Sequence, residues 1–251
     1  MTYVDFIADV LKNFRVVKGD KGIETIRVEI DAEDDDKLKV VSYNTSKSLI
    51  VLSEYKEGLD QEIPRTHGYG QLDYLNQIIS YAKGADEVDV KFKTNSNDVA
   101  TQTTFKINKK MVIKVRNLAE TLLPKIPRKL NTIQPEIEIK LDEDVLRDIV
   151  KALSFSIADA NVAFTSIKDK LNIKISNEID EILYPLNVDV PEGVLDEDFY
   201  IDLQAFSAIL KTISNDDDAV LYIAENKNLV KIDKSNDKYY YQYILSKKTY
   251  I

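Results

Sequence analysis

Apolar side chains recur at helical spacing in four segments of this chain, and each segment predicts one amphipathic helix. The four apolar stripes are Ile7, Val10, Leu11 and Phe14; Leu72, Leu75, Ile78 and Ile79; Val145, Leu146, Ile149 and Leu153; and Leu203, Phe206, Ile209, Leu210 and Ile213. Asp142 and Asp202 precede the last two stripes. Because an N-cap carboxylate accepts hydrogen bonds from the unpaired N–H groups of the first turn, we expect both aspartates to be N-caps.

Between the helical segments, apolar and polar residues alternate, which is typical of strands with one buried face. The clearest alternating runs are residues 26–30, 111–115, 137–141, 171–175 and 239–245. The segment from Ala32 to Arg65 is acidic and polar, and its pattern assigns no element.

The chain consists of two similar halves, each with the order helix, strands, helix, strands. The offset from Leu72 to Leu203 is 131 residues, and the offset from Ile7 to Leu146 is 139. Loops change length more readily than packed elements, so the two offsets fit a duplicated domain. A proline-rich segment with Pro124, Pro127 and Pro135 separates the halves, as a linker does. We predict an N-terminal domain over 1–123, a linker over 124–135 and a C-terminal domain over 136–251.

A resemblance to a known family rests on the second half. The helix with Leu203, Phe206, Ser207, Ile209, Leu210 and Lys211, then an Asn- and Asp-rich turn and an alternating strand, resembles the second helix of a DNA sliding-clamp domain. The order of elements is similar to that family throughout, and the two-domain length resembles the PCNA type and the clamps of large tailed bacteriophages. The resemblance implies an α+β clamp fold, with two helices packed on antiparallel sheets in each domain.

The same resemblance implies a function. Clamps of this type are non-enzymatic polymerase processivity factors that assemble as a homotrimeric ring around double-stranded DNA. Their contacts with DNA carry no sequence information. The implied partners are a DNA polymerase and a clamp-loader ATPase, and no cofactor is implied.

The charge of the chain limits how it can bind DNA. It has 34 Lys and Arg against 43 Asp and Glu, a net charge of −9, so an average part of its surface repels phosphate. DNA binding therefore requires segregated cations. A solvated helix face is the more common explanation for any single lysine, but recurrence at corresponding helices favours DNA contact for the set. The candidates are the basic residues on the helix faces opposite the apolar stripes: Lys12, Arg15, Lys83, Arg147, Lys151 and Lys211.

An apolar groove for partner peptides is also implied by the resemblance, beside the linker. The positions that match this groove are Tyr43, Leu123, Ile126, Tyr250 and Ile251. Ordinary core packing is the alternative interpretation for Leu123. The last two residues are less ordinary, because a frayed chain end is normally polar.

The sequence contains no arrangement typical of an enzyme. The absence of cysteine excludes disulfides, thiolate metal sites and cysteine nucleophiles, and it agrees with a reducing cytoplasm. His67 is the single histidine, and no serine motif accompanies it. The consecutive carboxylates at 34–36 and 216–218 point in different directions, which indicates solvated loops rather than metal ligands. We expect no enzymatic activity and no metal.

Two other functions stay open. A phage single-stranded DNA-binding protein would use the tyrosines at 239, 240, 241 and 243, although they alternate across a strand and no lysine lies between them. A metal-dependent nuclease would use the acidic clusters. No stretch approaches the roughly 20 apolar residues of a membrane span. We therefore expect a cytoplasmic protein, in the host cytoplasm if a phage encodes it, without membrane contact.

Overall fold

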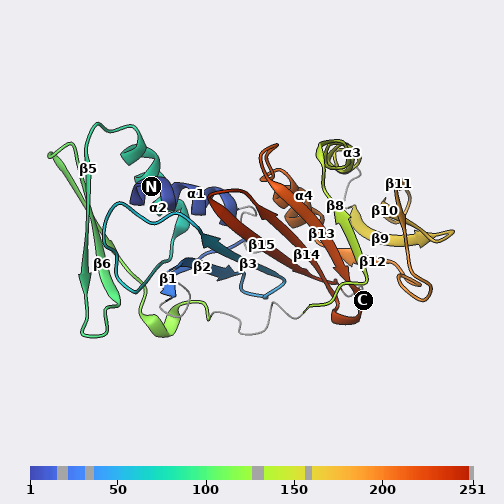
Figure 1. Cartoon of the computed structure of the whole chain (residues 1–251), viewed down its shortest axis with the longest axis horizontal. Helices are drawn as coiled ribbons and strands as arrows, with labels where there is room; N and C mark the ends of the chain where they lie inside the picture. The colour runs from blue at the N-terminus through green and yellow to red at the C-terminus, as the bar shows by residue number, and fades with distance from the viewer. Residues whose placement is uncertain (16–21, 32–36, 126–132, 156–159, 249–251) are drawn as a thin grey trace. The chain divides into compact units, whose positions relative to one another are not determined.

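A computed structural model describes residues 1–15, 22–31, 37–125, 133–155 and 160–248 of the chain (Figure 1). The chain divides into two compact units. Unit 1 comprises Met1–Thr45, Val51–Ile126 and Asp237–Tyr240, and unit 2 comprises Ser46–Ile50, Pro127–Asn236 and Tyr241–Ile251. The short exchanged segments at 46–50 and 237–240 were not predicted from the sequence.

Unit 1 combines a pair of helices with two sets of antiparallel strands. Its helices, α1 (Tyr3–Phe14) and α2 (Leu72–Lys83), contact each other. Four strands follow one another in the order β4 (Thr66–Tyr69), β1 (Ile26–Asp31), β2 (Lys37–Tyr43) and β3 (Leu49–Tyr55). A separate three-stranded sheet has the order β5 (Val88–Thr94), β6 (Ala100–Ile107) and β7 (Met111–Arg116), and the short helix η2 (Glu120–Leu122) follows it.

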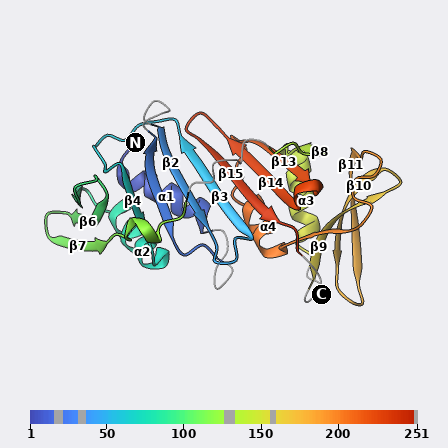
Figure 2. The ribbon, with the colours of Figure 1, turned by 90° about the horizontal axis from the view of Figure 1, so that it is seen from below.

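Unit 2 repeats this arrangement (Figure 2). Its helices are α3 (Glu143–Leu153) and α4 (Leu203–Leu210), which also contact each other. One sheet has the order β12 (Phe199–Ile201), β9 (Asn161–Ile167), β10 (Lys170–Ser176) and β11 (Glu181–Asp189). The other four strands have the order β15 (Tyr239–Ser246), β14 (Leu229–Ser235), β13 (Asp218–Ala224) and β8 (Ile137–Lys140), with η4 (Glu225–Lys227) before β14.

The predicted duplication is confirmed by the strand orders. The order β4-β1-β2-β3 in unit 1 corresponds to β12-β9-β10-β11 in unit 2, and β5-β6-β7 corresponds to β13-β14-β15. All four predicted helices are present, and the fold is α+β as expected. The segment from Ala32 to Arg65, which the sequence pattern left unassigned, contains β2 and β3.

Each unit buries its own apolar helix stripes. In unit 1, Phe6, Ile7 and Val10 of α1 are fully buried. In unit 2, Phe206 of α4 packs edge to face against Phe164 of β9, with ring centroids 5.6 Å apart. Burial of such aromatic side chains supplies much of the stability of a domain of this size.

Both predicted N-caps are confirmed. The Asp142 carboxylate accepts a hydrogen bond from the backbone N–H of Val145 at 2.9 Å, and the Asp202 carboxylate accepts one from Ala205 at 2.9 Å. Thr2 caps α1 in the same way, which the sequence analysis missed. Each cap is worth about 1 kcal/mol of helix stability.

Candidate nucleic-acid interface

Five of the six predicted DNA-contacting residues lie at the carboxyl ends of the helices, and Arg147 lies within α3. Lys12, Lys83 and Lys151 lie in the last turns of α1, α2 and α3, and Lys211 is the C-cap of α4. A cation at this end of a helix interacts favourably with the helix dipole. Helix stability therefore explains part of this placement, and a phosphate group approaching the helix ends would meet the same charges.

The six predicted residues fall into two groups. Three form ion pairs with helix carboxylates: Arg15 with Asp73, Lys83 with Asp5 at 3.9 Å, and Arg147 with Asp144 at 2.6 Å. The other three are exposed and form no ion pair with any residue that the structure describes: Lys12, Lys151 and Lys211. The second group is the one that is free to contact phosphate.

The helix surfaces carry mixed charge. In each unit, the two helices with their C-caps hold three cations and three carboxylates, the latter being Asp5, Asp9 and Asp73 in unit 1 and Glu143, Asp144 and Asp148 in unit 2. The helices as a whole therefore carry no excess of positive charge, and DNA contact would depend on how the cations are distributed among the helix faces.

Two exposed tyrosines on α2 were missed from the sequence. Tyr74 and Tyr81 are 48% and 55% exposed and lie seven residues apart, which places them on the same side of the helix. A tyrosine hydroxyl can donate a hydrogen bond to a phosphate oxygen. The signal in the sequence was the position of two large aromatic side chains outside the apolar stripe.

The predicted peptide-groove residues differ in their surroundings. Tyr43 is half-buried at the end of β2, whereas Leu123 is only 4% exposed. The Leu123 side chain lies against Gly68, and a larger residue at position 68 would clash with it. The neighbouring Leu122 is 67% exposed and is the better candidate for contact with a peptide. Ile126, Tyr250 and Ile251 lie outside the described residues.

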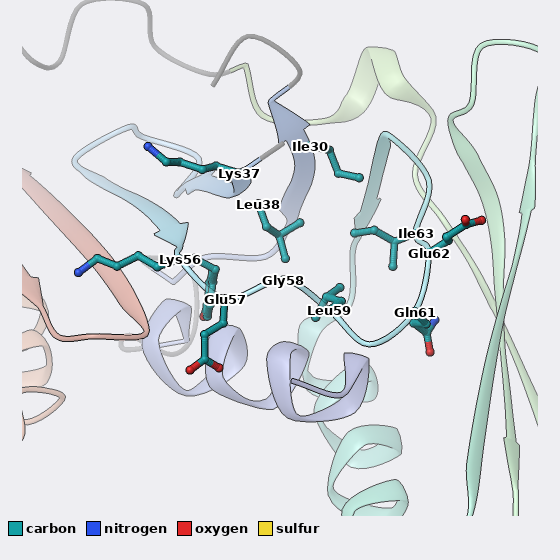
Figure 3. Close-up of a pocket in the computed structure, with 11 residues that line it drawn as sticks. Ile30, Lys37, Leu38, Lys56, Glu57, Gly58, Leu59, Gln61, Glu62 and Ile63 are labelled. Atoms are coloured by element: carbon teal, nitrogen blue, oxygen red, sulfur yellow. The ribbon is translucent and has the colours of Figure 1, made fainter. Parts of the chain in front are cut away.

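Unit 1 contains an open pocket of about 360 Å³ with a mixed polar and apolar lining, and none of these groove residues lines it (Figure 3). Its walls are Ile30 of β1, Leu38 of β2, and Leu59 and Ile63 of the loop between β3 and β4. Figure 3 shows the charged ends of the surrounding lysines and glutamates pointing away from the cavity. The volume suits a small ligand, but the charged groups that Figure 3 labels are directed away from the interior and do not orient one there.

His67 lies inside unit 1 and not at a reactive surface. Its ring is fully buried, and Nε2 is 2.8 Å from the hydroxyl of Tyr3. The Tyr3 hydroxyl also lies 2.7 Å from that of Tyr69, which is 2.8 Å from Thr103 Oγ1. Burial lowers the pKa of His67 to about 3, so the ring is neutral at physiological pH.

The acidic turn at 216–218 has a structural role. The buried Asp217 carboxylate accepts hydrogen bonds from the backbone N–H and hydroxyl of Ser214 at 2.9 Å and from the Asn236 amide at 3.0 Å. Among the residues that the structure describes, no group of three or more metal-ligating side chains comes together. The cluster at 34–36 lies outside those residues.

The tyrosines of β15 do not form a stacking surface for single-stranded DNA. Tyr241 and Tyr243 are fully buried, and their rings stack on each other with centroids 6.1 Å apart. A base cannot reach a buried ring, so this interpretation of the tyrosine run is wrong.

Each sheet of the described chain ends in two edge strands, and one edge from each unit matters for assembly. The strand β7, which contains Val112, is one edge of the sheet β5-β6-β7. The strand β10, which contains Leu171, pairs with both β9 and β11 and is not an edge. The edges of that sheet are β11 and β12.

Solved structures share this architecture over the full chain. The PCNA of A. fulgidus, solved with the C-terminal region of FEN-1 bound, matches with a TM-score of 0.64 at 14% identity, over 100% of this chain and 98% of that one. The PCNA of Entamoeba histolytica matches with a TM-score of 0.62 at 15% identity, over 98% of this chain and 96% of that one. The chain has the DNA sliding-clamp fold.

Other comparisons fit this clamp fold. A putative DNA polymerase III beta subunit from Eubacterium rectale matches with a TM-score of 0.65 at 14% identity, and the chain covers 65% of that longer protein. No protein-family model matches the sequence, and no curated protein matches it significantly. No described helix of this clamp-fold chain combines the length and the apolar character needed to cross a membrane.

Proposed function

We propose that the protein is a sliding clamp, a non-enzymatic processivity factor that closes around duplex DNA and tethers a replicative DNA polymerase. The observation that carries this proposal is the clamp fold over the whole chain, in which two repeated units each present a helix pair and two sets of strands. Retention on DNA then comes from enclosure and needs no tight or sequence-specific contact.

Ring closure uses the edge strands β7 and β11. One strand belongs to each unit, so copies of the chain join head to tail, and the contact closes when the rotation per subunit divides the circle. We propose a homotrimer of six units. Exposed apolar residues lie on both strands: Met111 and Val112 on β7, and Leu183 on β11. Pairing these edges would also cover backbone groups that otherwise promote aggregation.

The charges near the two edge strands have opposite sign. The strand β7 and its preceding turn carry only cations: Lys109, Lys110, Lys114 and Arg116. The strand β11 and its preceding turn carry only carboxylates: Glu178, Asp180, Glu181 and Asp189. Such complementarity favours contact of β7 with β11 and disfavours contact of either strand with itself.

Within the ring, the exposed helix lysines contact phosphates. Lys12, Lys151 and Lys211 are the primary candidates, and these contacts weaken as salt rises and permit movement along the duplex. A clamp-loader ATPase would open the ring. Since the A. fulgidus PCNA binds a C-terminal region of FEN-1, we propose that partner peptides bind here beside the linker, where Leu122 is exposed and where Tyr43, Ile126, Tyr250 and Ile251 remain predicted contacts.

Sedimentation equilibrium tests the assembly on which this function depends. At micromolar concentration the mass should be that of three subunits, with a reversible shift to smaller species on dilution. A mass that stays at one subunit over the whole range, including at low salt, would count against a closed ring.

A further inference from the structure

Positive charge gathers on the outer face of the sheet β5-β6-β7. Residues paired in register share a face, and the rows across this face are Lys91, Thr104 and Lys114; Lys93, Gln102 and Arg116; and Asp89, Lys106 and Val112. We call these nine residues the cationic sheet face. It holds five cations and one carboxylate, in a chain whose net charge is −9.

The cations of this face point away from unit 1. The alternate residues, including Val90, Phe105 and Val115, are buried, which fixes the charged residues on the solvent side. Phe92 on the inner side contacts Tyr3 of α1, with ring centroids 5.2 Å apart. The cationic sheet face therefore lies on the side of the sheet opposite to α1, and DNA contacted by the helices cannot neutralise it.

Four of the five cations have no ionic partner in the described chain. Lys91 is 3.5 Å from Asp89, whereas Lys93, Lys106, Lys114 and Arg116 form no ion pair with any described residue. Cations on alternate residues of one strand are about 6.8 Å apart. Like charges at such distances on one face repel each other, so the arrangement costs stability unless an anion binds. In the proposed ring, the carboxylates of β11 lie near Lys114 and Arg116 of the edge strand, so Lys91, Lys93 and Lys106 of β5 and β6 carry the inference.

The duplication provides an internal comparison. On the corresponding sheet of unit 2, Lys231 is 2.8 Å from Asp233 and its Nζ lies 4.1 Å from the centroid of the Tyr222 ring. Other strand cations are paired, as in Lys39 with Asp31 at 2.6 Å and Lys174 with Asp198 at 2.8 Å, whereas Lys140 of β8 forms no ion pair with a described residue. An unpaired cation occurs elsewhere, but the grouping of four on one face is a feature of the sheet β5-β6-β7.

The residues between the cations indicate the kind of partner. Thr104 and Gln102 are neutral hydrogen-bond donors, which contact phosphate oxygens in protein–DNA complexes. The face has no aromatic ring on which an unpaired base could stack. Val112, at one end, is its single apolar residue, so the face offers no pocket for the apolar anchor of a peptide.

We propose that the cationic sheet face binds the phosphate backbone of duplex DNA, at a site separate from the helices. The inference goes beyond the proposed function, because it gives the protein a second, open DNA-binding surface that needs no enclosure. Binding is independent of sequence and depends steeply on salt, since each phosphate contact releases a counterion. Such a surface would hold a duplex against the outside of the protein.

The test measures binding of a linear, fluorescein-labelled 30-base-pair duplex by anisotropy at low salt, using the full chain. The variant K91E/K93E/K106E changes only β5 and β6 and leaves the β7 edge intact. The matched control K140E/K168E/K227E makes the same change in net charge at three exposed lysines of unit 2. We expect at least tenfold weaker binding by the face variant, and less than a threefold change for the control.

Three results would overturn the proposal. The first is that the face variant binds the duplex as tightly as the wild type does. The second is that the control variant loses as much affinity as the face variant. The third is that polyglutamate displaces the duplex as effectively as unlabelled duplex does, which would identify a general polyanion site. A single-stranded oligonucleotide bound more tightly than the duplex would contradict the choice of duplex. Sedimentation mass and thermal midpoint, measured on the same samples, show that the face variant folds and assembles. They also separate this proposal from ring formation, since a monomeric chain can still bind through the face.

Discussion

The hydroxyl of Tyr3 lies 2.8 Å from Nε2 of His67, and both side chains are buried in unit 1. The contact joins the first turn of α1 to β4, two segments separated by more than 60 residues in the sequence. The Nε2 atom of a neutral imidazole can accept a hydrogen bond from the tyrosine hydroxyl, but an imidazolium ion at the same place would be a buried charge.

Protonation of His67 should therefore weaken the fold. Its pKa is about 3 in the folded state against about 6.5 in the unfolded chain, so its contribution is complete above pH 6.5 and is lost as the pH falls towards 3. Between pH 7 and pH 5, the wild type should lose about 2 kcal/mol more unfolding free energy than H67Q. Urea unfolding at the two pH values measures this difference, and parallel losses in both proteins would show that His67 does not titrate on unfolding.

Asp217 should be essential to the turn between α4 and β13, and its neighbours should not. Lys234, which is 1% exposed, has its Nζ 4.0 Å from this carboxylate and donates a hydrogen bond to the backbone oxygen of Thr212 at 2.9 Å, so D217N removes a negative charge beside a buried ammonium. We expect a destabilisation of about 3 kcal/mol for D217N. The exposed neighbours supply the controls D216N and D218N, whose effects should stay within about 0.5 kcal/mol. Chemical denaturation of the three variants measures the loss of unfolding free energy in each. Similar losses in all three would contradict a specific role for Asp217.

The charges of β7 should control self-association. Reversal of Lys114 and Arg116 in K114E/R116E should weaken assembly about tenfold, because two attractive contacts with the acidic strand β11 become repulsive. Adding E178K and D180K to this variant should restore much of the lost association. Sedimentation velocity over a dilution series gives the association constant of each variant. Assembly that is indifferent to all four changes would place the interface elsewhere.

Reversal of the basic residues on the helices of unit 2 should weaken retention on DNA without unfolding the protein. In R147E/K151E/K211E, three cations near α3 and α4 become repulsive to phosphate, and the loss should be greatest at low salt. Retention on nicked circular duplex during gel filtration measures the effect, with circular dichroism as the test of folding. Unchanged retention would show that these helices do not face the DNA.

Much of the fold could be predicted because its elements follow strong local rules. The stripe of Phe206, Ile209 and Leu210 fixed the helix α4, and Asp202 marked its start, since both signals act within one or two turns. The strands β2 and β3 were harder to predict. Charged residues such as Lys39 and Glu54 make the apolar–polar pattern of this region hard to recognise. Their charges pair only once the strands lie together.

The candidate site could be predicted less well, for a physical reason. Sequence spacing identifies the face of a helix on which Arg15 or Lys83 lies, but it does not show that carboxylates of the facing helix neutralise them. The cationic sheet face was likewise invisible, because it combines residues of three strands whose registers are set by tertiary pairing. The sequence also does not show that Leu123 is buried and the adjacent Leu122 exposed, because this difference depends on the packing of Leu123 against Gly68.

Enclosure of DNA is the central claim, and the absence of native cysteine allows one direct test. Exposed Val112 and Leu183 lie on the two edge strands, so V112C/L183C can be joined between copies by a short bifunctional thiol crosslinker in the presence of nicked circular duplex. If the ring encloses DNA, the crosslinked protein stays with the circle in detergent and is released by a single restriction cut. Crosslinked protein that leaves the intact circle as soon as detergent is added would contradict enclosure.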